Sequence, residues 1–508
     1  MSEIPCLPAC LRLKVYPPYF VRGASQVLFL QLPVRTVPCA DPAFVTSSLL
    51  LALWGEDSVG HADPVAPILL VLVLIAIGAA LGGRAMRWVD QPAVLGELLV
   101  GVIIANIGYA LREPILTVLR EGDTISRIVA LALQNALALP DAVHRILTAG
   151  ADADRLAAAL AGPMGPLAVS VHSFVDLLSR IAVIVLLFLV GLETDIGEMK
   201  KVGWPSFIVA IVGVIAPFLL GIGAMAVLLP DAPLEKDIFI GAILTATSVG
   251  ITARVFRDLR QTQRTEAHII LGAAVIDDVL GLLILAVVSA LVVTGTISVA
   301  SISWITLKAV LFLVGSIAVG LWLAPRMVRR IARLRIENLK LLFGLGFAFV
   351  LAWLANLSGL ATIVGAFAAG LVLESFFDKE LEGHSLRDLL SPIESLIVPV
   401  FFVLMGMQVK LETFADWKVT LIAVVLTLCA IAGKLVAGLG CSPRLDRLSV
   451  GIGMMPRGEV GLIFAGIGKG LGVVSDAVFS AVVIMVMITT LLTPPLLKVT
   501  LARSRPAA

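Results

Sequence analysis

Long apolar runs follow one another along most of this chain. We count thirteen runs of about 20 residues, the length that an α-helix needs to cross the hydrocarbon core of a bilayer. Their approximate ranges are 66–83, 92–109, 175–195, 205–229, 236–256, 266–294, 303–325, 339–356, 359–376, 389–409, 417–440, 448–470 and 475–497. The pattern predicts an all-α polytopic membrane protein with thirteen transmembrane helices.

An internal echo relates the third apolar run to the tenth. Phe188–Asp195 reads FLVGLETD, and Val403–Lys410 reads VLMGMQVK. A short polar stretch with a tryptophan follows each of them, Trp204 in one case and Trp417 in the other. Because the two runs lie an odd number of segments apart, they cross the membrane in opposite directions, which predicts an inverted-topology repeat.

Two apolar runs are interrupted near their middle by polar and glycine residues. The first interruption is Thr245–Gly250 (TATSVG) and the second is Met455–Gly461 (MPRGEVG). Paired broken helices in inverted halves are typical of transporters, whose ion site lies between them at the bilayer midplane. Thr245, Thr247 and Ser248 add hydroxyl oxygens there, which either contact an ion or hydrogen-bond back to their own helix.

Composition and charge agree with a membrane protein and give its orientation. Hydrophobic residues make up 59% of the chain and charged residues 15%, against roughly 45–50% and 25% in soluble proteins. Lys and Arg concentrate in the loops after odd-numbered runs, such as 326–340, and are few in the loops after even-numbered runs. The positive-inside rule therefore predicts a multi-pass protein of the cell (inner) membrane with its N-terminus outside and its C-terminus in the cytoplasm.

Three stretches lie outside the apolar pattern. Residues 1–65 are irregular, and their short apolar stretch Val45–Trp54 fits either a signal-peptide core or unstructured residues after an upstream start codon. Residues 110–174 are predicted to form a long external loop. Within it, Ile125–Leu139 has helical periodicity, which suits a helix on the membrane surface or a covering helix. Residues 499–508 are predicted to form a cytoplasmic tail.

The sequence does not indicate an enzyme. The five cysteines match no zinc or disulfide spacing. No phosphate loop, HExxH or GxSxG motif occurs, and no set of nucleophile and base is evident. We therefore expect no cofactor and no nucleic-acid partner.

Two adjacent acids, Asp277 and Asp278, lie near the middle of run 266–294. A carboxylate at a helix centre costs about 2.5–3.5 kcal/mol on insertion scales, which favours a functional reason for each of them. The alternative is a polar clamp between helices. Because adjacent helical residues point about 100° apart, one aspartate can pair with a neighbouring helix while the other faces a water-filled cavity.

Other charged residues in apolar runs need partners. Lys434 lies deep in its run, and an aspartate of the pair is its natural partner, with Glu459 as a competitor. Arg457 and Glu459 either satisfy each other, bind the opposing broken helix, or contact the ion. Glu97 lies nearer to a helix end, and we interpret it as structural.

Five stretches of the chain resemble the cation/proton antiporter superfamily, in its second branch with NapA-type and Kef-type members. These stretches are QPAVLGELLVGVIIAN (91–106), FLVGLETD (188–195), GAILTATSVGITARV (241–255), LGAAVIDDVLGL (271–282) and GMMPRGEVGLIFA (453–465). They are distributed over most of the membrane domain predicted at 66–498, and their combination is specific.

The resemblance implies a homodimer with an elevator-type fold, in which two discontinuous helices cross beside the ion site. Helices in 175–294 and 389–497 would form the core domain, and the first and intervening helices would form the dimerisation scaffold. The chain departs from the family in the length of 110–174. It also lacks the C-terminal nucleotide-binding domain of Kef-type members, which weakens a regulated K⁺-efflux interpretation.

By the same resemblance, Asp278 is similar to the carboxylate that binds both the cation and the proton. Asp277 is similar to the partner of the buried lysine, Lys434. Thr247 and Ser248 would lie in the first crossing helix, and Glu459 with Arg457 in the second. Members with two acids at this point tend to be electrogenic, so the resemblance implies electrogenic Na⁺ (Li⁺)/H⁺ exchange in pH homeostasis.

The residues support antiport on physical grounds as well. A carboxyl group buried in the membrane can hold a proton because burial disfavours its charge, and a cation such as Na⁺ or K⁺ can then compete for it. The alternatives are K⁺/H⁺ exchange, a sodium-coupled symporter of organic solutes, and a membrane sensor that does not transport.

Overall fold

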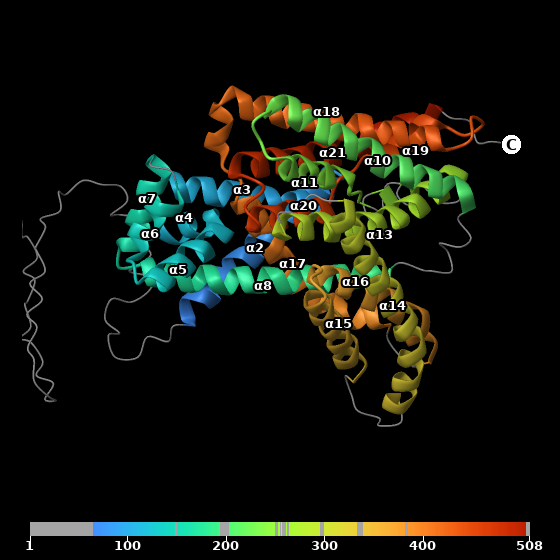
Figure 1. The fold of residues 1–508 in the computed structure, drawn as a ribbon, viewed down its shortest axis with the longest axis horizontal. Coiled ribbons are helices and arrows are strands. Elements are labelled where there is room, and N and C mark those ends of the chain that lie inside the picture. The colour runs from blue at the N-terminus through green and yellow to red at the C-terminus, as the bar shows by residue number, and fades with distance from the viewer. Residues whose placement is uncertain are drawn as a thin grey trace, which may run out of the picture.

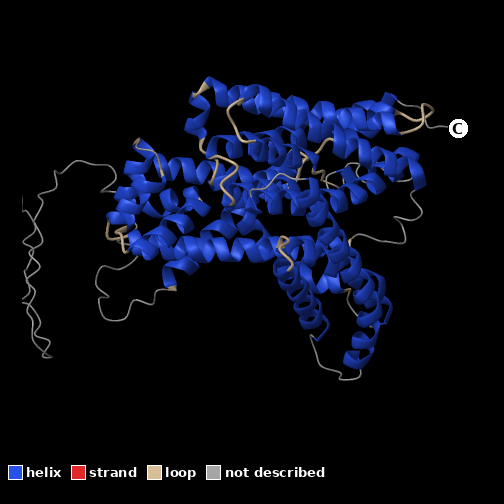
Figure 2. Ribbon diagram, in the orientation of Figure 1, coloured by secondary structure: helices blue, strands red, loops and turns tan. Residues whose placement is uncertain are grey.

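The computed structural model describes residues 65–147, 150–193, 203–248, 252–253, 256, 261, 264–294, 299–332, 339–380 and 385–503. Over these residues the secondary structure is entirely helical (Figure 2). The predicted signal-peptide core Val45–Trp54 and the end of the predicted tail, 504–508, lie outside the described residues.

Ten described helices are long and apolar enough to cross a membrane. They are α2 (Ala66–Trp88), α3 (Ala93–Ala110), α8 (Gly165–Leu192), α10 (Gly203–Leu228), α13 (Thr265–Thr294), α14 (Val299–Ala332), α15 (Leu339–Leu357), α17 (Leu386–Met407), α18 (Trp417–Ala437) and α21 (Asp476–Arg503). The chain is thus a multi-pass membrane protein.

None of the other three predicted runs forms a helix both long and apolar enough among the described residues, where ten such helices occur. One run forms α16 (Thr362–Glu380), whose apolar part is shorter. The two interrupted runs break where the sequence predicts. The helix α11 (Leu234–Thr245) ends at the first interruption, while α19 (Arg447–Gly453) and α20 (Glu459–Gly470) flank the second.

The helices form two groups (Figure 1). We call α10, α11, α13 and α18–α21 the broken-helix bundle, because these helices pack on one another and include both interrupted runs. We call α2, α3, α8 and α15–α17 the frame bundle. The helix α14 packs against α13 of the first and α16 of the second. The predicted core domain, formed by helices in 175–294 and 389–497, includes α8 and α17 and therefore needs correction. In the structure α8 packs on α16 and α17 packs on α3, so both helices belong to the frame bundle.

Glycine contacts explain why α8 and α17 lie in the frame bundle. On α17, a Cβ at Gly406 would overlap the Leu98 carbonyl of α3 and lie 3.1 Å from the Gly101 Cα. On α8, a Cβ at Gly191 would overlap a carbonyl of α16 and lie 3.0 Å from the Gly370 Cα. The absence of side chains lets each pair of backbones approach closely, as small residues do in membrane helix packing.

The same contacts support the repeat. Gly191 and Gly406 occupy the same place in the echoed sequences FLVGLETD and VLMGMQVK, and their partners α16 and α3 also correspond. Gly96 packs on a carbonyl of α2 and lies five residues before Gly101, which meets α17. Likewise, Gly365 packs on a carbonyl of α15 and lies five residues before Gly370, which meets α8. Two halves of the chain thus repeat one packing scheme.

These contacts predict a stability effect. Gly406→Ala should reduce stability by about 1–3 kcal/mol, because the new methyl group forces α3 and α17 apart. Gly223→Ala on α10 is the matched control, since nothing lies within 4 Å of a Cβ there. The measurement is the temperature of unfolding of each purified variant in detergent. An unchanged unfolding temperature for Gly406→Ala would contradict a tight contact.

The segment 110–174 is not the long loop that we expected. It forms four short helices, and α8 already begins at Gly165. These helices are α4 (Pro114–Glu121), α5 (Asp123–Asn135), α6 (Leu139–Ile146) and α7 (Ala151–Ala161). The predicted helix Ile125–Leu139 is divided, because Ala136 adopts the left-handed conformation with φ 49° and ends α5. Ile125 and Ile128 are fully buried, so α5 packs on other helices.

Candidate functional site

The two adjacent acids lie on α13 and are both buried. Asp277 is 1% exposed and Asp278 is 5% exposed. Successive residues of a helix point in different directions, so the two carboxylates meet different surroundings. Their partners therefore have to be considered separately.

Asp277 pairs with the buried lysine of α18. The Nζ of Lys434 lies 3.1 Å from Oδ1 and 3.2 Å from Oδ2 of Asp277, and neither side chain is exposed. Gly213 of α10 lies beside the ammonium group, at a position where a Cβ would be 3.6 Å from Nζ, an ordinary contact distance. Lys434 thus takes the aspartate, and not Glu459, as its ion-pair partner.

Asp278 has no such partner. Its Oδ1 is buried without a hydrogen-bond partner among the described residues. The charges within electrostatic reach of Asp278 are Asp277, Glu459 and Lys434. Leaving a buried polar oxygen unsatisfied is unfavourable, so this atom is a candidate to bind a proton or a cation.

The two interrupted helices meet beside this pair. The backbone N–H of Ser248 donates to the Pro456 carbonyl at 2.9 Å. The Ser248 hydroxyl donates to Glu459 at 3.4 Å, and the absence of a side chain at Gly458 leaves room for it. On the far side of the break, the Thr252 hydroxyl donates to the Gly453 carbonyl at 2.7 Å. The helix ends thus cross and satisfy one another.

Arg457 holds the crossing together and does not pair with Glu459 in the described contacts. Its guanidinium group is fully buried and donates to the Ala246 carbonyl just after α11, and to the Ala430 carbonyl of α18 at 3.3 Å. The backbone carbonyl of Arg457 accepts a hydrogen bond from the Thr490 hydroxyl. A cation is favourable at the C-terminal end of a helix, which explains this choice of partner.

The hydroxyl groups at the first break differ in their use. Thr245 donates to the carbonyl of Ala242 in its own helix at 2.8 Å, as the structural interpretation predicts. The Thr247 oxygen lies close to Asp277 but outside hydrogen-bond geometry, and it is buried without a partner among the described residues. Thr247 and Asp278 therefore supply two buried, unused oxygens.

A cavity of about 440 Å³ leads from the ends of three frame-bundle helices to Glu459. Three further carboxylates line it: Glu97 of α3, Glu193 at the end of α8 and Glu394 of α17. Sequence reasoning gave Glu97 a structural role and missed Glu394. A signal was present, because both are isolated acids inside apolar runs.

Comparison with known proteins shows the family of the chain. The profile of a family described as "Sodium/hydrogen exchanger, transmembrane" matches residues 68–503. The chain belongs to this family. The sodium/hydrogen exchangers are membrane transporters and not enzymes, and no cofactor is required.

Curated relatives of this sodium/hydrogen exchanger carry related names. The chain is 36% identical to the high-affinity Na⁺/H⁺ antiporter NhaS3 of Synechocystis sp., over 85% of this chain and 89% of that protein. It is 34% identical to the Na⁺/H⁺–K⁺ antiporter GerN of Bacillus cereus, over 64% of this chain and 82% of that protein.

A solved structure is similar in fold. The sodium/proton antiporter MjNhaP1 of Methanocaldococcus jannaschii superposes with a TM-score of 0.56 at 19% identity, covering 85% of this exchanger and 96% of that chain. The all-helical antiporter fold is thereby established for the chain.

Proposed function

We propose that this protein exchanges Na⁺ for H⁺ by alternating access, with Asp278 as the carboxylate that both ions share. The observation that carries the proposal is the unpartnered Oδ1 of Asp278, buried beside the crossing of the interrupted helices. Binding of a proton or a cation satisfies this oxygen. Membership of the exchanger family and the antiporter names of the relatives support the same reaction.

The cation would be held by side-chain oxygens. Alkali cations take oxygen ligands, and Asp278, Thr247, Ser248 and Glu459 present such atoms around the break. The Ala246 carbonyl is already engaged by Arg457, so the side chains would carry most of the coordination. Among the described residues no group of three His, Cys, Asp or Glu side chains forms a resident metal site.

Competition for one carboxylate makes the exchange obligatory. Asp278 would carry a proton in one direction and a cation in the other. With neither bound, Asp278 would move as an uncompensated buried charge, which is unfavourable in a poorly solvated region. In the proposed motion, the broken-helix bundle shifts against the frame bundle in an elevator-like step.

The acidic cavity would serve as the entrance for cations. Clefts lined by one sign of charge raise the local concentration of counter-ions. Glu394→Gln is therefore expected to raise the KM for Na⁺ about 3-fold at low ionic strength, with little change in maximal rate. The effect should shrink in high salt because the lining charges are screened.

The control for this prediction is Asp231→Asn, which removes an exposed carboxylate from the α10–α11 turn, outside the cavity lining. Rates are measured as proton flux in liposomes over a range of Na⁺ concentrations. Equal effects of both variants, or a fall in maximal rate alone, would contradict an entrance role for Glu394.

Ion-dependent proton flux tests the proposed function directly. Purified protein is reconstituted in liposomes with an internal pH dye, and Na⁺, Li⁺, K⁺ or choline is added separately. We expect Na⁺ and Li⁺ to dissipate the pH gradient. A response to K⁺ with none to Na⁺ would favour K⁺/H⁺ exchange, and no response to any cation would end the antiporter proposal.

Orientation and assembly complete the proposal. The distribution of Lys and Arg supports an N-terminus outside and a C-terminus in the cytoplasm of a cell inner membrane. A homodimer would form through the frame bundle, whose outer helix α2 presents Leu69, Val73 and Ile77. Cysteine labelling from each side of the membrane and cross-linking in native membranes test these two points.

A further inference from the structure

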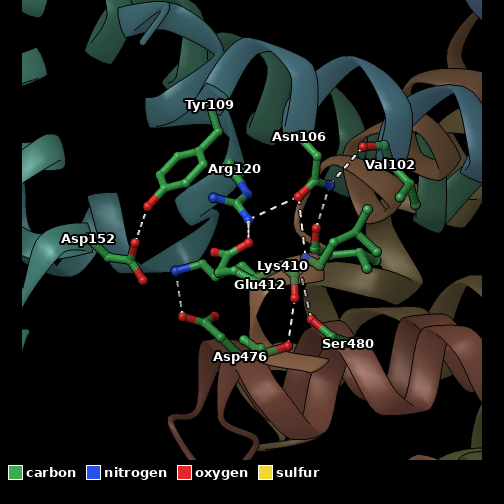
Figure 3. Close-up of polar contacts among 12 residues, drawn as sticks. Val102, Asn106, Tyr109, Arg120, Asp152, Lys410, Glu412, Asp476 and Ser480 are labelled. Carbon is green, nitrogen blue, oxygen red and sulfur yellow. Dashed lines mark hydrogen bonds and ion pairs between the residues drawn. The ribbon is translucent and has the colours of Figure 1, made fainter. Parts of the chain in front are cut away.

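A second cluster of buried charges lies at the opposite end of the bundle interface from the acidic cavity. Lys410 follows α17 and is 5% exposed, and Glu121 of α4 is 3% exposed. The Lys410 Nζ lies 2.8 Å from Glu121. It also lies 2.9 Å from Asp476 at the start of α21, a contact drawn in Figure 3. Lys469 of α20 pairs with the other Asp476 oxygen at 2.9 Å. Two lysines and two acids thus balance one another.

The cluster is distant from the proposed ion site. Glu459 begins α20, and Lys469 lies ten residues later on the same helix. At 1.5 Å per residue, this separation is about 15 Å along the axis. The proposed exchange uses none of the four residues. Three of them are buried, and the Asp476 side chain is 26% exposed; burying charges costs free energy that only close pairing offsets.

One of these ion pairs, Lys410 with Asp476, joins the two bundles. Lys410 directly follows α17, and Glu121 belongs to α4, which packs on frame helices α3 and α8, whereas Asp476 and Lys469 belong to the broken-helix bundle. A backbone contact adds to them, because the N–H of Lys410 donates to the Ser480 hydroxyl of α21 at 3.0 Å. The cluster therefore has to separate if the bundles part at this end.

The segment that connects the bundles is also fixed here, as Figure 3 shows. Asn106 of α3 donates to the Val409 carbonyl at 2.9 Å and accepts from the Leu411 N–H at 3.2 Å. Arg120 donates to the Asn106 oxygen at 3.0 Å and pairs with Glu412. The connection from α17 to α18 is thereby tied to α3 and α4.

The two ends of the bundle interface thus differ. At one end, the start of α3, the end of α8 and the start of α17 line the acidic cavity that reaches Glu459. At the other end, the later parts of α3 and α17 join the buried ion pairs. One end is hollow, and the other is held by the pair between Lys410 and Asp476, which exists only while the bundles touch.

We propose that Lys410, Glu121, Asp476 and Lys469 are positioning residues for exchange, forming a latch that keeps the interface shut at the end opposite the cavity. The inference rests on the proposed alternating access, because the latch must open for Asp278 to face that side. It also gives the segment 110–174 a role, since α4 contributes Glu121.

The test compares accessibility at the two ends of the interface. The reporter for the latch side is Gly466→Cys on α20, where a Cβ meets the Met405 sulfur of α17 at an ordinary 3.5 Å. The reporter for the cavity side is Ser395→Cys, which lines the cavity. Each is introduced into a full-length chain whose five native cysteines are replaced, and labelling by a membrane-impermeant maleimide is followed in liposomes.

Asp476→Asn removes the carboxylate that pairs with Lys410 across the bundles. It is expected to accelerate labelling at Cys-substituted position 466 about 10-fold and to slow labelling at position 395, since a modest loss of coupling shifts a two-state population by that factor. Lys410→Arg should keep the original rates. The double variant Lys410→Glu with Asp476→Lys reverses the cross-bundle pair and serves as a second test; it should label at position 466 more slowly than Lys410→Glu by itself.

Asp176→Asn is the matched control, because its carboxylate pairs with Arg180 within α8 at 2.8 Å and joins no second bundle. The latch is overturned if Asp476→Asn leaves both labelling rates unchanged, or if Asp176→Asn changes them equally. Gel filtration and unfolding temperature verify folding of every variant. Labelling needs no transport, so a wild type that fails to exchange ions while the latch variants respond would reject the proposed function and retain the latch.

Discussion

Asp278→Asn is expected to abolish cation-dependent proton flux, with a loss of at least about 100-fold that reflects removal of the ionisable group itself. Asparagine has nearly the same shape, but it neither binds a proton at this site nor offers a negative charge to a cation. Because the Asp278 Oδ1 has no hydrogen-bond partner among the described residues, the substitution removes no described contact of that oxygen. The variant should therefore insert and fold normally.

The measurement is proton flux in liposomes with saturating Na⁺, together with the unfolding temperature in detergent. Asp231→Asn in the exposed α10–α11 turn is the control for the same chemical change elsewhere. Exchange at the wild-type rate by purified Asp278→Asn protein would rule out Asp278 as the shared carboxylate.

Lys434→Gln is expected to convert an electrogenic exchange into an electroneutral one. In the proton-loaded state Lys434 would be protonated and paired with Asp277, as in the ion pair of 3.1 Å described above. A cation entering at Asp278 would weaken this pair, and Lys434 would release its proton. Together with the proton from Asp278, this release moves net charge in every cycle.

Transport current on a solid-supported membrane distinguishes these cases. Wild-type protein should give a current on a Na⁺ step, whereas Lys434→Gln should exchange ions without one. The variant Lys434→Arg keeps the positive charge but does not release a proton readily, because a guanidinium group stays protonated. We expect this variant to lose the transport current. A wild type that exchanges ions with no current would show that Lys434 has a structural role.

The sequence predicts much of the fold because apolar length and helix breaks are local properties. Clustered polar, proline and glycine residues in 245–250 and 455–461 interrupt the apolar runs locally, and both breaks lie where expected. The grouping of α8 and α17 is different. It depends on backbone contacts that Gly191 makes with α16 and Gly406 makes with α3. The hydrophobic periodicity of the sequence does not reveal such contacts. The folding of 110–174 was missed because its helices are short and less apolar.

The candidate site shows the same division. A buried lysine requires a carboxylate, so the sequence leads to the contact between Lys434 and Asp277. The partner of Arg457 was left open, because the Ala246 carbonyl becomes a partner only when two distant helix ends cross. The cavity joins Glu97 and Glu394 from separate helices, and their convergence is a property of tertiary packing.

The glycine crossings have a mechanical consequence. Where Gly406 meets Gly101, and where Gly191 meets Gly370, backbone touches backbone, and no side chains lie between to change rotamer and absorb a displacement. Steric repulsion rises steeply with small displacements, so such contacts resist sliding much more than interfaces of leucine and valine do. The frame bundle should therefore behave as a rigid unit. Relative motion of the helices should concentrate at the boundary between the frame bundle and the broken-helix bundle.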